Sequence, residues 1–531
     1  MWDAIALPSF ARVTPSTTLT DTARSPRWVK VLDQTRCIGC HACTTACKSE
    51  NQVPLGVTRT YVKTVEVGTF PQVRRSFQVT RCNQCTDPPC VAACPTGAMY
   101  RRPDGIVDFD KASCIGCKAC IAACPYDAIF INPEDHSAEK CNFCAHRLEI
   151  GLEPACVTVC PTEAILVGDL NDPTSKVSRI VQREPVAVRR PEKETRPGLY
   201  YKGAHQATLD PLAARRPTGG LFAWATQGAD PGPKALSQHV VSGHPNHPNS
   251  SAAALLSYDV PHHAPWGWRV SLYTWTKGLA AGAYLVALML VLAGSLSWSS
   301  TLFRFVAPSI SLAMLGATGV LLVWDLKHPM RFYMLFTRPQ WRSWLVRGGV
   351  IIAGYGTVLA AQLVAGGLDS VVASKVLAGF GLPFGVLTAA YTAFLFAQAR
   401  ARDLWQNPLL APHLVVQAVM VGSAALLIAA SALGDHHLLH DLELALGTAA
   451  GVHLAMLVGE TTPHHVTAHA ELAVDEMTFG RFAGFFWVGA VLVAAAVAAP
   501  WIGLAAAPLA LVGLLSHEHA YVQAGQSVPL A

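Results

Sequence analysis

Sixteen cysteines, arranged in four groups of four, constrain this chain more than any other feature of its sequence. All of them lie between residues 37 and 160, and the rest of the 531 residues contain none. The first group has the spacing C-x2-C-x2-C-x3-C, and each of the other groups ends in a Cys-Pro pair. The groups are Cys37, Cys40, Cys43 and Cys47; Cys82, Cys85, Cys90 and Cys94; Cys114, Cys117, Cys120 and Cys124; and Cys141, Cys144, Cys156 and Cys160.

This spacing is typical of iron–sulfur clusters, because a [4Fe–4S] cubane needs four thiolates and a C-x2-C-x2-C turn supplies three of them. Structural zinc sites instead use two C-x2-C pairs with a longer spacer between them. Disulfides need an oxidising compartment and do not explain the repeated spacing. Apolar residues between the ligands, such as Ile38 and Ile115, are expected to cover the sulfurs.

Composition divides the chain into two parts. The chain is 51% hydrophobic and only 14% charged. After Trp268 the apolar residues gather into about eight segments that are long enough, or nearly so, to cross a bilayer. We therefore expect a membrane domain, although the last segment is short and could be re-entrant. The segments are Leu272–Leu296, Leu302–Trp324, Leu345–Gly366, Val371–Phe396, Pro412–Leu433, Leu438–Val458, Phe482–Ala499 and Trp501–Leu515.

The cysteine-rich part contains short strand-like runs bounded by turn residues, at Tyr61–Val67, Arg75–Val79 and Gly105–Phe109. The expected fold class is α+β: a ferredoxin-like domain over residues 28–205, then an all-α polytopic membrane domain over residues 268–531. Residues 206–267 are rich in Pro, Gly and His and are expected to be a linker. Because Met1–Pro26 lacks an apolar signal segment, export of the first domain is not expected.

On these cysteines, residues 28–205 resemble the four-cluster ferredoxin-type subunit of the dimethyl sulfoxide reductase, polysulfide reductase and nitrate reductase group. The resemblance implies four [4Fe–4S] clusters. It also implies that the first and fourth groups share two clusters, and that the second and third groups share the other two. The implied ligand sets are Cys37, Cys40, Cys43 and Cys160; Cys47, Cys141, Cys144 and Cys156; Cys82, Cys85, Cys90 and Cys124; and Cys94, Cys114, Cys117 and Cys120.

The second part resembles the polysulfide reductase/NrfD-type membrane anchor family. Three sequences carry this resemblance: SLYTWTKG from Ser271, DLKHPMRF from Asp325, and EHAYVQAGQ from Glu518. The resemblance implies an eight-helix, haem-free anchor that binds a quinone close to the iron–sulfur subunit.

Ionisable residues in or beside the predicted spans are candidates for the quinone site, because such groups are costly in a membrane and quinone chemistry moves protons. With eight spans, Lys277, Asp325, His328 and Tyr391 lie towards the cluster side, as do His413, His453 and Glu460. Each also has a structural interpretation. Lys277 could extend to the membrane surface, Asp325 could brace a loop, and Tyr391 could belong to an interfacial belt. His453 has no evident partner within the spans to form a haem site.

Basic residues predict the orientation. The loops on the cluster side carry Lys327, Arg331, Arg338, Arg342, Arg347, Arg400 and Arg402, whereas the opposite loops offer Arg304 and Lys375. The positive-inside rule places the cluster domain in the cytoplasm of a bacterial or archaeal cell, unless these arginines instead dock that domain. No nucleic-acid-binding pattern accompanies them.

Together, these features and resemblances predict an electron-transfer and membrane-anchor subunit of a respiratory complex. It would pass electrons between a molybdenum or tungsten bis-pterin subunit and menaquinone or ubiquinone. The partner's substrate and the direction of electron flow stay open, with oxidation of sulfite or formate and reduction of sulfur compounds or sulfoxides as candidates. Two alternatives remain: a haem-b quinone cytochrome fused to ferredoxin, and a zinc-binding membrane receptor.

Overall fold

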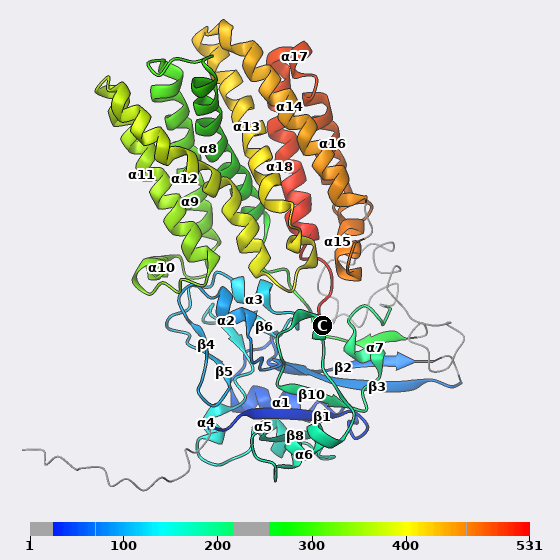
Figure 1. The fold of residues 1–531 in the computed structure, drawn as a ribbon. Helices are drawn as coiled ribbons and strands as arrows, with labels where there is room; N and C mark the ends of the chain where they lie inside the picture. The colour runs from blue at the N-terminus through cyan, green and yellow to red at the C-terminus, as the bar shows by residue number, and fades with distance from the viewer. Residues whose placement is uncertain (1–24, 69–70, 216–253, 463–464) are drawn as a thin grey trace, which may run out of the picture.

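The computed structural model describes residues 25–68, 71–215, 254–462 and 465–531. Within them, a domain of small sheets and short helices lies against one end of a bundle of long helices (Figure 1). The expected α+β domain followed by an all-α membrane domain is thus confirmed. Most of Met1–Pro26 and residues 216–253 of the expected linker lie outside the described residues.

The cluster domain contains four small sheets. Their strand orders are β8-β1-β10-β9, β11-β2-β3, β4-β5 and β6-β7. The strands are β1 Trp28–Asp33, β2 Thr60–Val67, β3 Arg74–Arg81, β4 Met99–Arg101, β5 Val107–Phe109, β6 Ile129–Ile131, β7 Ala138–Lys140, β8 Ile165–Asp169, β9 Val186–Ala187, β10 Leu199–Lys202 and β11 Leu255–Tyr258. The helices are α1 Ala42–Glu50, α2 Pro89–Ala93, α3 Ala119–Ala123, α4 Ala145–Leu148, α5 Ala155–Thr158, α6 Lys176–Arg183 and α7 Gln206–Leu209. The three strand-like runs expected from the sequence correspond to β2, β3 and β5.

Strand β1 shows how alternation along a strand positions a functional side chain. Val29 and Val31 point to one face and pack with Val177 and Ile180 of α6. Leu32 points to the other face and packs with cysteine residues. Lys30 shares this second face, because side chains two residues apart lie on the same side of a strand. The alternation therefore directs a buried amine towards the cysteines.

The expected linker contributes structure at both of its described ends. Helix α7 lies at its start, and β11 near its end pairs antiparallel with β2, with Leu256 opposite Val65. The small residues Ala213, Ala214 and Ala254 pack under this edge together with Val65 and Leu256. The chain therefore adds a strand to the cluster domain before it enters the bundle.

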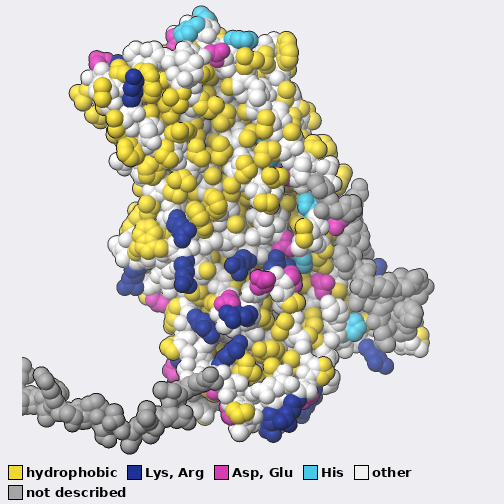
Figure 2. All heavy atoms as spheres, in the orientation of Figure 1, with side chains coloured by type: hydrophobic (Ala, Val, Ile, Leu, Met, Phe, Trp, Pro, Cys, Tyr) yellow, Lys and Arg dark blue, Asp and Glu magenta, His cyan; other side chains and the backbone are white. Residues whose placement is uncertain are grey.

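The bundle contains seven helices that are long and apolar enough to cross a membrane, and an eighth candidate made of two helices bent by 71°, among the described residues. The bent pair is α15 Ala468–Thr478 and α16 Ala483–Ala496. The other helices are α8 Trp268–Ala293, α9 Ala307–Asp325, α10 Met334–Thr337, α11 Trp344–Gly367, α12 Val371–Gln398, α13 Leu410–Leu433, α14 His436–Thr461, α17 Ala499–Ile502 and α18 Ala506–Ala524. Hydrophobic side chains cover the outer face of the bundle in Figure 2, as a lipid-facing surface requires.

Helix α8 is the central helix of the bundle. In the most apolar 18-residue stretch of α8, 83% of the residues are buried. The corresponding share is 28% in the peripheral helices α11 and α12. It packs closely on α13 because two glycines meet there. A Cβ atom on Gly282 would lie 1.8 Å from the backbone oxygen of Ala418, and one on Gly422 would lie 2.2 Å from the carbonyl carbon of Gly282. This close approach agrees with the packing expected of small residues in membrane helices.

Candidate functional site

The fold brings the cysteines together in four sets. Burial is the main cause that raises the pKa of several of these thiols, for example to about 11 for Cys43 and about 12 for Cys47, and neighbouring cysteines raise it further. These electrostatic neighbours identify which cysteines lie close together. Set I is Cys37, Cys40, Cys43 and Cys160; set II is Cys47, Cys141, Cys144 and Cys156; set III is Cys82, Cys85, Cys90 and Cys124; set IV is Cys94, Cys114, Cys117 and Cys120.

The sets follow one another in a row. Cys43 of set I interacts electrostatically with Cys156 of set II. Cys141 of set II interacts in the same way with Cys82 of set III, and Cys90 of set III with Cys120 of set IV. Each set therefore has a neighbour in the next, from set I to set IV.

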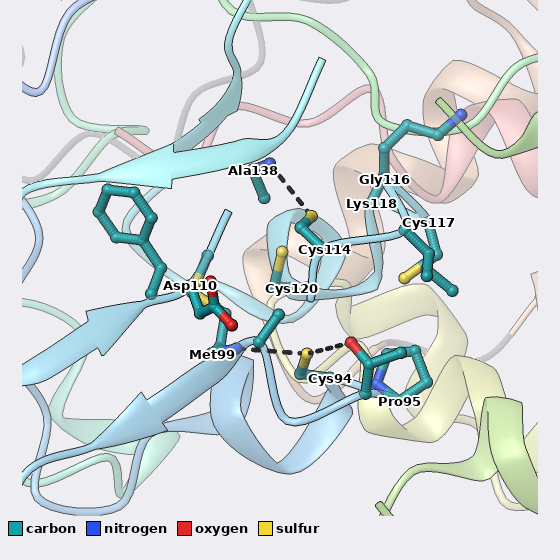
Figure 3. Close-up of a pocket in the computed structure, with 14 residues that line it drawn as sticks. Cys94, Pro95, Met99, Asp110, Cys114, Gly116, Cys117, Lys118, Cys120 and Ala138 are labelled. Carbon is teal, nitrogen blue, oxygen red and sulfur yellow. Dashed lines mark hydrogen bonds between the residues drawn. The ribbon is translucent and has the colours of Figure 1, made fainter. Parts of the chain in front are cut away.

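Set IV surrounds a pocket, which all four of its cysteines line. Figure 3 shows their sulfur atoms around this space, with Sγ of Cys94 accepting a hydrogen bond from the backbone N–H of Met99 and Sγ of Cys114 accepting one from Ala138, at 3.3 and 3.4 Å. None of the sixteen cysteines is in a disulfide. Four free thiols around one space, with N–H donors aimed at the sulfurs, fit an iron–sulfur cluster.

Two buried cations lie beside set II. Nη1 of Arg81 donates to Sγ of Cys156 at 2.9 Å, and Nζ of Lys30 lies 3.7 Å from the same sulfur. Burial alone would raise the pKa of Cys156, but Arg81 and then Lys30 lower it to about 7. The side chains of both cations are fully buried, so they exert their charge without screening by solvent.

The apolar residues between the ligands differ in exposure. Ile115 in set IV is 1% exposed, as expected for a residue that covers sulfur. Ile38 in set I is 58% exposed, so it does not share the burial of Ile115. The physical reason is position: set IV faces the bundle, whereas set I lies at the far end of the row. Cys40 beside Ile38 is exposed as well.

The loop between α9 and α11, residues 326–343, binds the turn that carries set IV. The backbone N–H groups of Lys327 and His328 donate to the carbonyl oxygens of Gly116 and Ile115, at 3.3 and 3.2 Å. Gly116 has φ +69°, and a Cβ atom there would lie 2.4 Å from Cβ of Lys327. We call residues 326–343 the docking loop.

Arginines and polar side chains of the docking loop strengthen this contact. Nη1 of Arg331 donates to the carbonyl oxygen of Cys114 at 3.0 Å, and Nη1 of Arg338 donates to Oγ of Ser113 at 2.9 Å. These two arginines therefore dock the cluster domain, which was the alternative to their role in membrane orientation. From the start of α8, the indole N–H of Trp266 reaches the carbonyl oxygen of Cys117 at 3.2 Å.

The structure divides the four predicted quinone-site residues into two pairs. Lys277 and Tyr391 lie together inside the bundle, with Nζ of Lys277 5.1 Å from the centroid of the Tyr391 ring. Asp325 and His328 lie at the boundary with the cluster domain. There, the carboxylate of Asp325 pairs with Nζ of Lys118 at 2.8 Å. Tyr273 of α8 lies near both Tyr391 and Asp325.

The inner pair does not have the structural roles considered for it. Lys277 is 1% exposed and donates to the backbone oxygen of Ala389 and to Oγ1 of Thr392, at 2.6 and 2.8 Å. It therefore does not extend to the membrane surface. Tyr391 is 3% exposed and is not an interfacial belt residue.

Two features of the bundle were missed from the sequence. Glu518 interacts electrostatically with Lys277 and accepts a hydrogen bond from Oγ1 of Thr274 at 2.6 Å. It was missed because the last apolar segment was expected to end at Leu515, whereas α18 continues to Ala524. His453 does have a partner: its Nδ1 lies 2.7 Å from Nε2 of His413.

Comparisons with known proteins agree with this geometry. A family model described as a 4Fe-4S dicluster domain matches residues 73–170, and one described as polysulphide reductase, NrfD, matches residues 258–529. One tetrathionate reductase subunit of Salmonella typhimurium is 44% identical over 197 residues, which are 36% of this chain and 77% of that protein.

Two further relatives match a similar share of the chain. A protein of Halobacterium salinarum named as an iron-sulfur subunit of dimethyl sulfoxide reductase is 40% identical over 216 residues, 35% of this chain and 82% of that protein. The thiosulfate reductase electron transfer protein PhsB of Salmonella typhi is 44% identical over 184 residues, 34% of this chain and 95% of that protein.

Proposed function

The chain belongs to the polysulphide reductase, NrfD, family and also carries a 4Fe-4S dicluster domain, and we propose that it is the electron-transfer and membrane-anchor subunit of a quinone-linked respiratory complex. It is a multi-pass membrane protein. In this function, electrons pass between a separate catalytic subunit and the membrane quinone pool. The observation that carries the proposal is the row of four cysteine sets that leads to the bundle.

We propose four [4Fe–4S] clusters, one held by each of sets I to IV. Bound there, the clusters would supply one-electron redox steps. The protein's own contribution is charge and shielding: Arg81 and Lys30 place two positive charges beside Cys156, and Ile115 keeps solvent from set IV. Backbone N–H groups of Met99, Ala138 and Ala164 donate to cysteine sulfurs of sets IV and I, which stabilises the more negative state.

The quinone is proposed to bind near Lys277 and Tyr391, with Asp325 and His328 at the cluster-side entrance. Quinone reduction takes up two protons, so the headgroup needs side chains that can donate and accept them. Lys277 and Glu518 interact within the bundle, and Tyr273 lies near both Asp325 and Tyr391. These residues can hold a quinone headgroup and exchange protons with it on the side of the bundle that faces set IV.

The catalytic partner is proposed to dock at set I. Cys40 is exposed there, Ile38 is 58% exposed, and Val159 beside Cys160 is 39% exposed. Apolar side chains around an outer redox site are what a protein partner would cover. The relatives named as subunits of tetrathionate, dimethyl sulfoxide and thiosulfate reductases support a partner that carries a molybdenum or tungsten bis-pterin cofactor.

The cluster domain is proposed to lie in the cytoplasm. Arg331 and Arg338 contact that domain, so their position is explained by docking and gives weaker evidence for the orientation. Lys327, Arg342 and Arg347 are exposed on the same side of the bundle and still support the orientation.

The quinone site is tested with Lys277→Met, measuring the rate at which a quinol reduces the clusters in anaerobically purified protein. We expect the variant to keep its iron content and its reduction by dithionite, but to react with quinol at least tenfold more slowly. Lys375→Met is the matched control, because Lys375 lies over the ring of Trp298 on the other side of the bundle. An unchanged rate in Lys277→Met would remove Lys277 from the site.

Asp325 needs a control of its own, because its carboxylate also pairs with Lys118. Asp325→Asn removes both the ion pair and the proton-accepting group. Lys118→Met breaks the same ion pair but leaves the carboxylate in place. A slower quinol reaction in Asp325→Asn but not in Lys118→Met assigns the effect to the carboxylate. Equal slowing in both variants would show that Asp325 acts through docking alone.

A further inference from the structure

Three histidines from three different helices meet inside the bundle, beside the proposed quinone site. His413 lies on α13, His453 on α14 and His517 on α18, and each is at most 3% exposed. One nitrogen from each ring can be chosen so that the three lie within 4.8 Å of one another. The ring centroids of the three pairs are 4.8, 5.0 and 6.0 Å apart.

Only some of the ring nitrogens of these three histidines have a hydrogen-bond partner. Nδ1 of His413 faces Oε1 of Glu460 at 3.0 Å, and its Nε2 faces Nδ1 of His453 at 2.7 Å. Nε2 of His453 and Nδ1 of His517 are buried and have no hydrogen-bond partner among the described residues. Buried polar atoms are rarely left without a partner, because their desolvation is then uncompensated.

The pairing of Glu460 with His413 has a chemical consequence. When a carboxylate accepts the N–H of one ring nitrogen, it fixes the tautomer and leaves the other nitrogen with a free lone pair. Nε2 of His413 then points a lone pair towards Nδ1 of His453. This carboxylate–histidine arrangement is the one that supports metal-ligating imidazoles in proteins.

We propose that His413, His453 and His517 form a binding site for one divalent transition-metal ion, with Glu460 orienting His413. Three neutral imidazoles suit ions such as Zn²⁺, for which three histidines with an open fourth position are a known arrangement. Glu460 and Glu518 line the adjoining pocket, and their carboxylates balance the charge of the ion. The bound ion joins α13, α14 and α18 at their cluster-side ends.

A haem does not fit between Nε2 of His413 and Nδ1 of His453. Two axial nitrogens with an iron between them are separated by about two metal–nitrogen bonds, or roughly 4 Å. The observed nitrogens of His413 and His453 are 2.7 Å apart, which leaves no space for a flat macrocycle between the rings. A single metal ion has no macrocycle, so it can bind both nitrogens if they move apart slightly.

The experiment uses the full chain, purified anaerobically with its iron–sulfur clusters, treated with a chelator and then titrated with Zn²⁺. Zinc K-edge X-ray absorption distinguishes the proposed site from zinc bound to cysteine, because Zn–N distances are about 2.0–2.1 Å and Zn–S distances about 2.3 Å. We expect one zinc per chain with a shell of nitrogen and oxygen only. A sulfur shell, or no retained zinc, would overturn the proposal.

Variants locate the ion within the bundle. His453→Ala and His517→Ala should lose zinc binding, and Glu460→Gln should bind zinc about 10–100-fold more weakly, as expected for loss of an orienting carboxylate. His437→Ala is the matched control, because His437 is exposed at the other end of α14. Cluster absorbance shows that the cluster domain of each variant is folded, and thermal unfolding in detergent shows the same for the bundle. If the histidine variants are folded and bind zinc like the wild type, the proposal is wrong.

Discussion

The contact between Arg81 and Cys156 illustrates what a single buried charge does beside a redox group. The guanidinium donates to the sulfur at 2.9 Å, and Lys30 adds a second positive charge at 3.7 Å. A positive charge stabilises whichever state is more negative, which for an iron–sulfur cluster is the reduced state. Set II should therefore have a raised reduction potential among the four sets.

Arg81→Met tests this effect directly. Removing one charge at this distance is worth several kcal/mol at an effective dielectric constant of about 20, so the potential of the cluster at set II should fall by on the order of 100 mV. A smaller fall is expected at set I, because Arg81 also interacts with Cys43. Arg81→Lys should restore most of it. The measurement is a redox titration followed by electron paramagnetic resonance. Arg179→Met, in an exposed position on α6, is the control and should leave all potentials unchanged.

His262 shows a second charge effect at residue scale. Its ring contacts Asp127 and Asp259, and although burial lowers its pKa, Asp259 and Asp127 raise it to about 10. Because the folded-state pKa is above the unfolded value, the protonated ring stabilises the fold fully below pH 6.5, and this stabilisation is lost as pH rises towards 10.

The pH dependence of thermal unfolding measures this contribution. His262→Gln should unfold at a lower temperature than the wild type at pH 6.5, and the difference should shrink steadily as the pH is raised. A difference that stays constant over this pH range would show that the charge on His262 does not stabilise the fold.

At the scale of elements, the docking loop decides whether the two parts of the chain meet correctly. Gly116 and Gly97 have the same φ of +69°, but a Cβ atom meets Lys327 only at Gly116, whereas nothing lies within 4 Å of one at Gly97. Both alanine variants therefore place a side chain at the same positive φ. Only Gly116→Ala also brings that side chain into a clash with Lys327. Gly116→Ala should destabilise the protein by about 1–3 kcal/mol more than Gly97→Ala, as expected for overpacking.

Thermal unfolding in detergent compares the two glycine variants, and quinol-driven cluster reduction shows whether docking has changed. We expect Gly116→Ala to be slower than Gly97→Ala in the second assay. Equal behaviour of the two variants would mean that the docking loop tolerates a side chain on the set IV turn.

The elements themselves were largely predictable from local pattern. Long apolar runs predicted the helices of the bundle, because a membrane span needs about twenty apolar residues. The 71° bend between α15 and α16 was not predicted. Helix α15 carries Glu471, Asp475 and Glu476. Because of these charges, it does not form part of an apolar run in the sequence. Strand β11 was missed because β2, the strand with which it pairs, lies almost two hundred residues earlier in the chain.

At the scale of the whole molecule, sequence patterns predicted two parts but not their interface. Cysteine spacing indicates clusters, and the resemblance supplied the ligand sets, since no local rule links Cys37 to Cys160. The contact of Lys118 with Asp325 joins residues far apart in the chain, so it depends on how the two domains meet. His413, His453 and His517 are separated in the same way, and only the packing of three helices brings them together.

One property is expected of the complete chain and not of either domain alone. The row of cysteine sets ends at the docking loop, and Lys277 and Tyr391 lie in the bundle beyond it. A single polypeptide should therefore carry electrons between iron–sulfur clusters and a quinone without its catalytic partner.

The most direct test reduces the purified chain with dithionite in lipid nanodiscs, removes the reductant, and adds a quinone while cluster absorbance is recorded. Sixteen cysteines at four per cubane correspond to four clusters, so the preparation should hold about sixteen irons and sixteen sulfides. We predict that the quinone reoxidises the clusters and is itself reduced to quinol. Fully loaded protein whose clusters stay reduced after quinone is added would contradict the account.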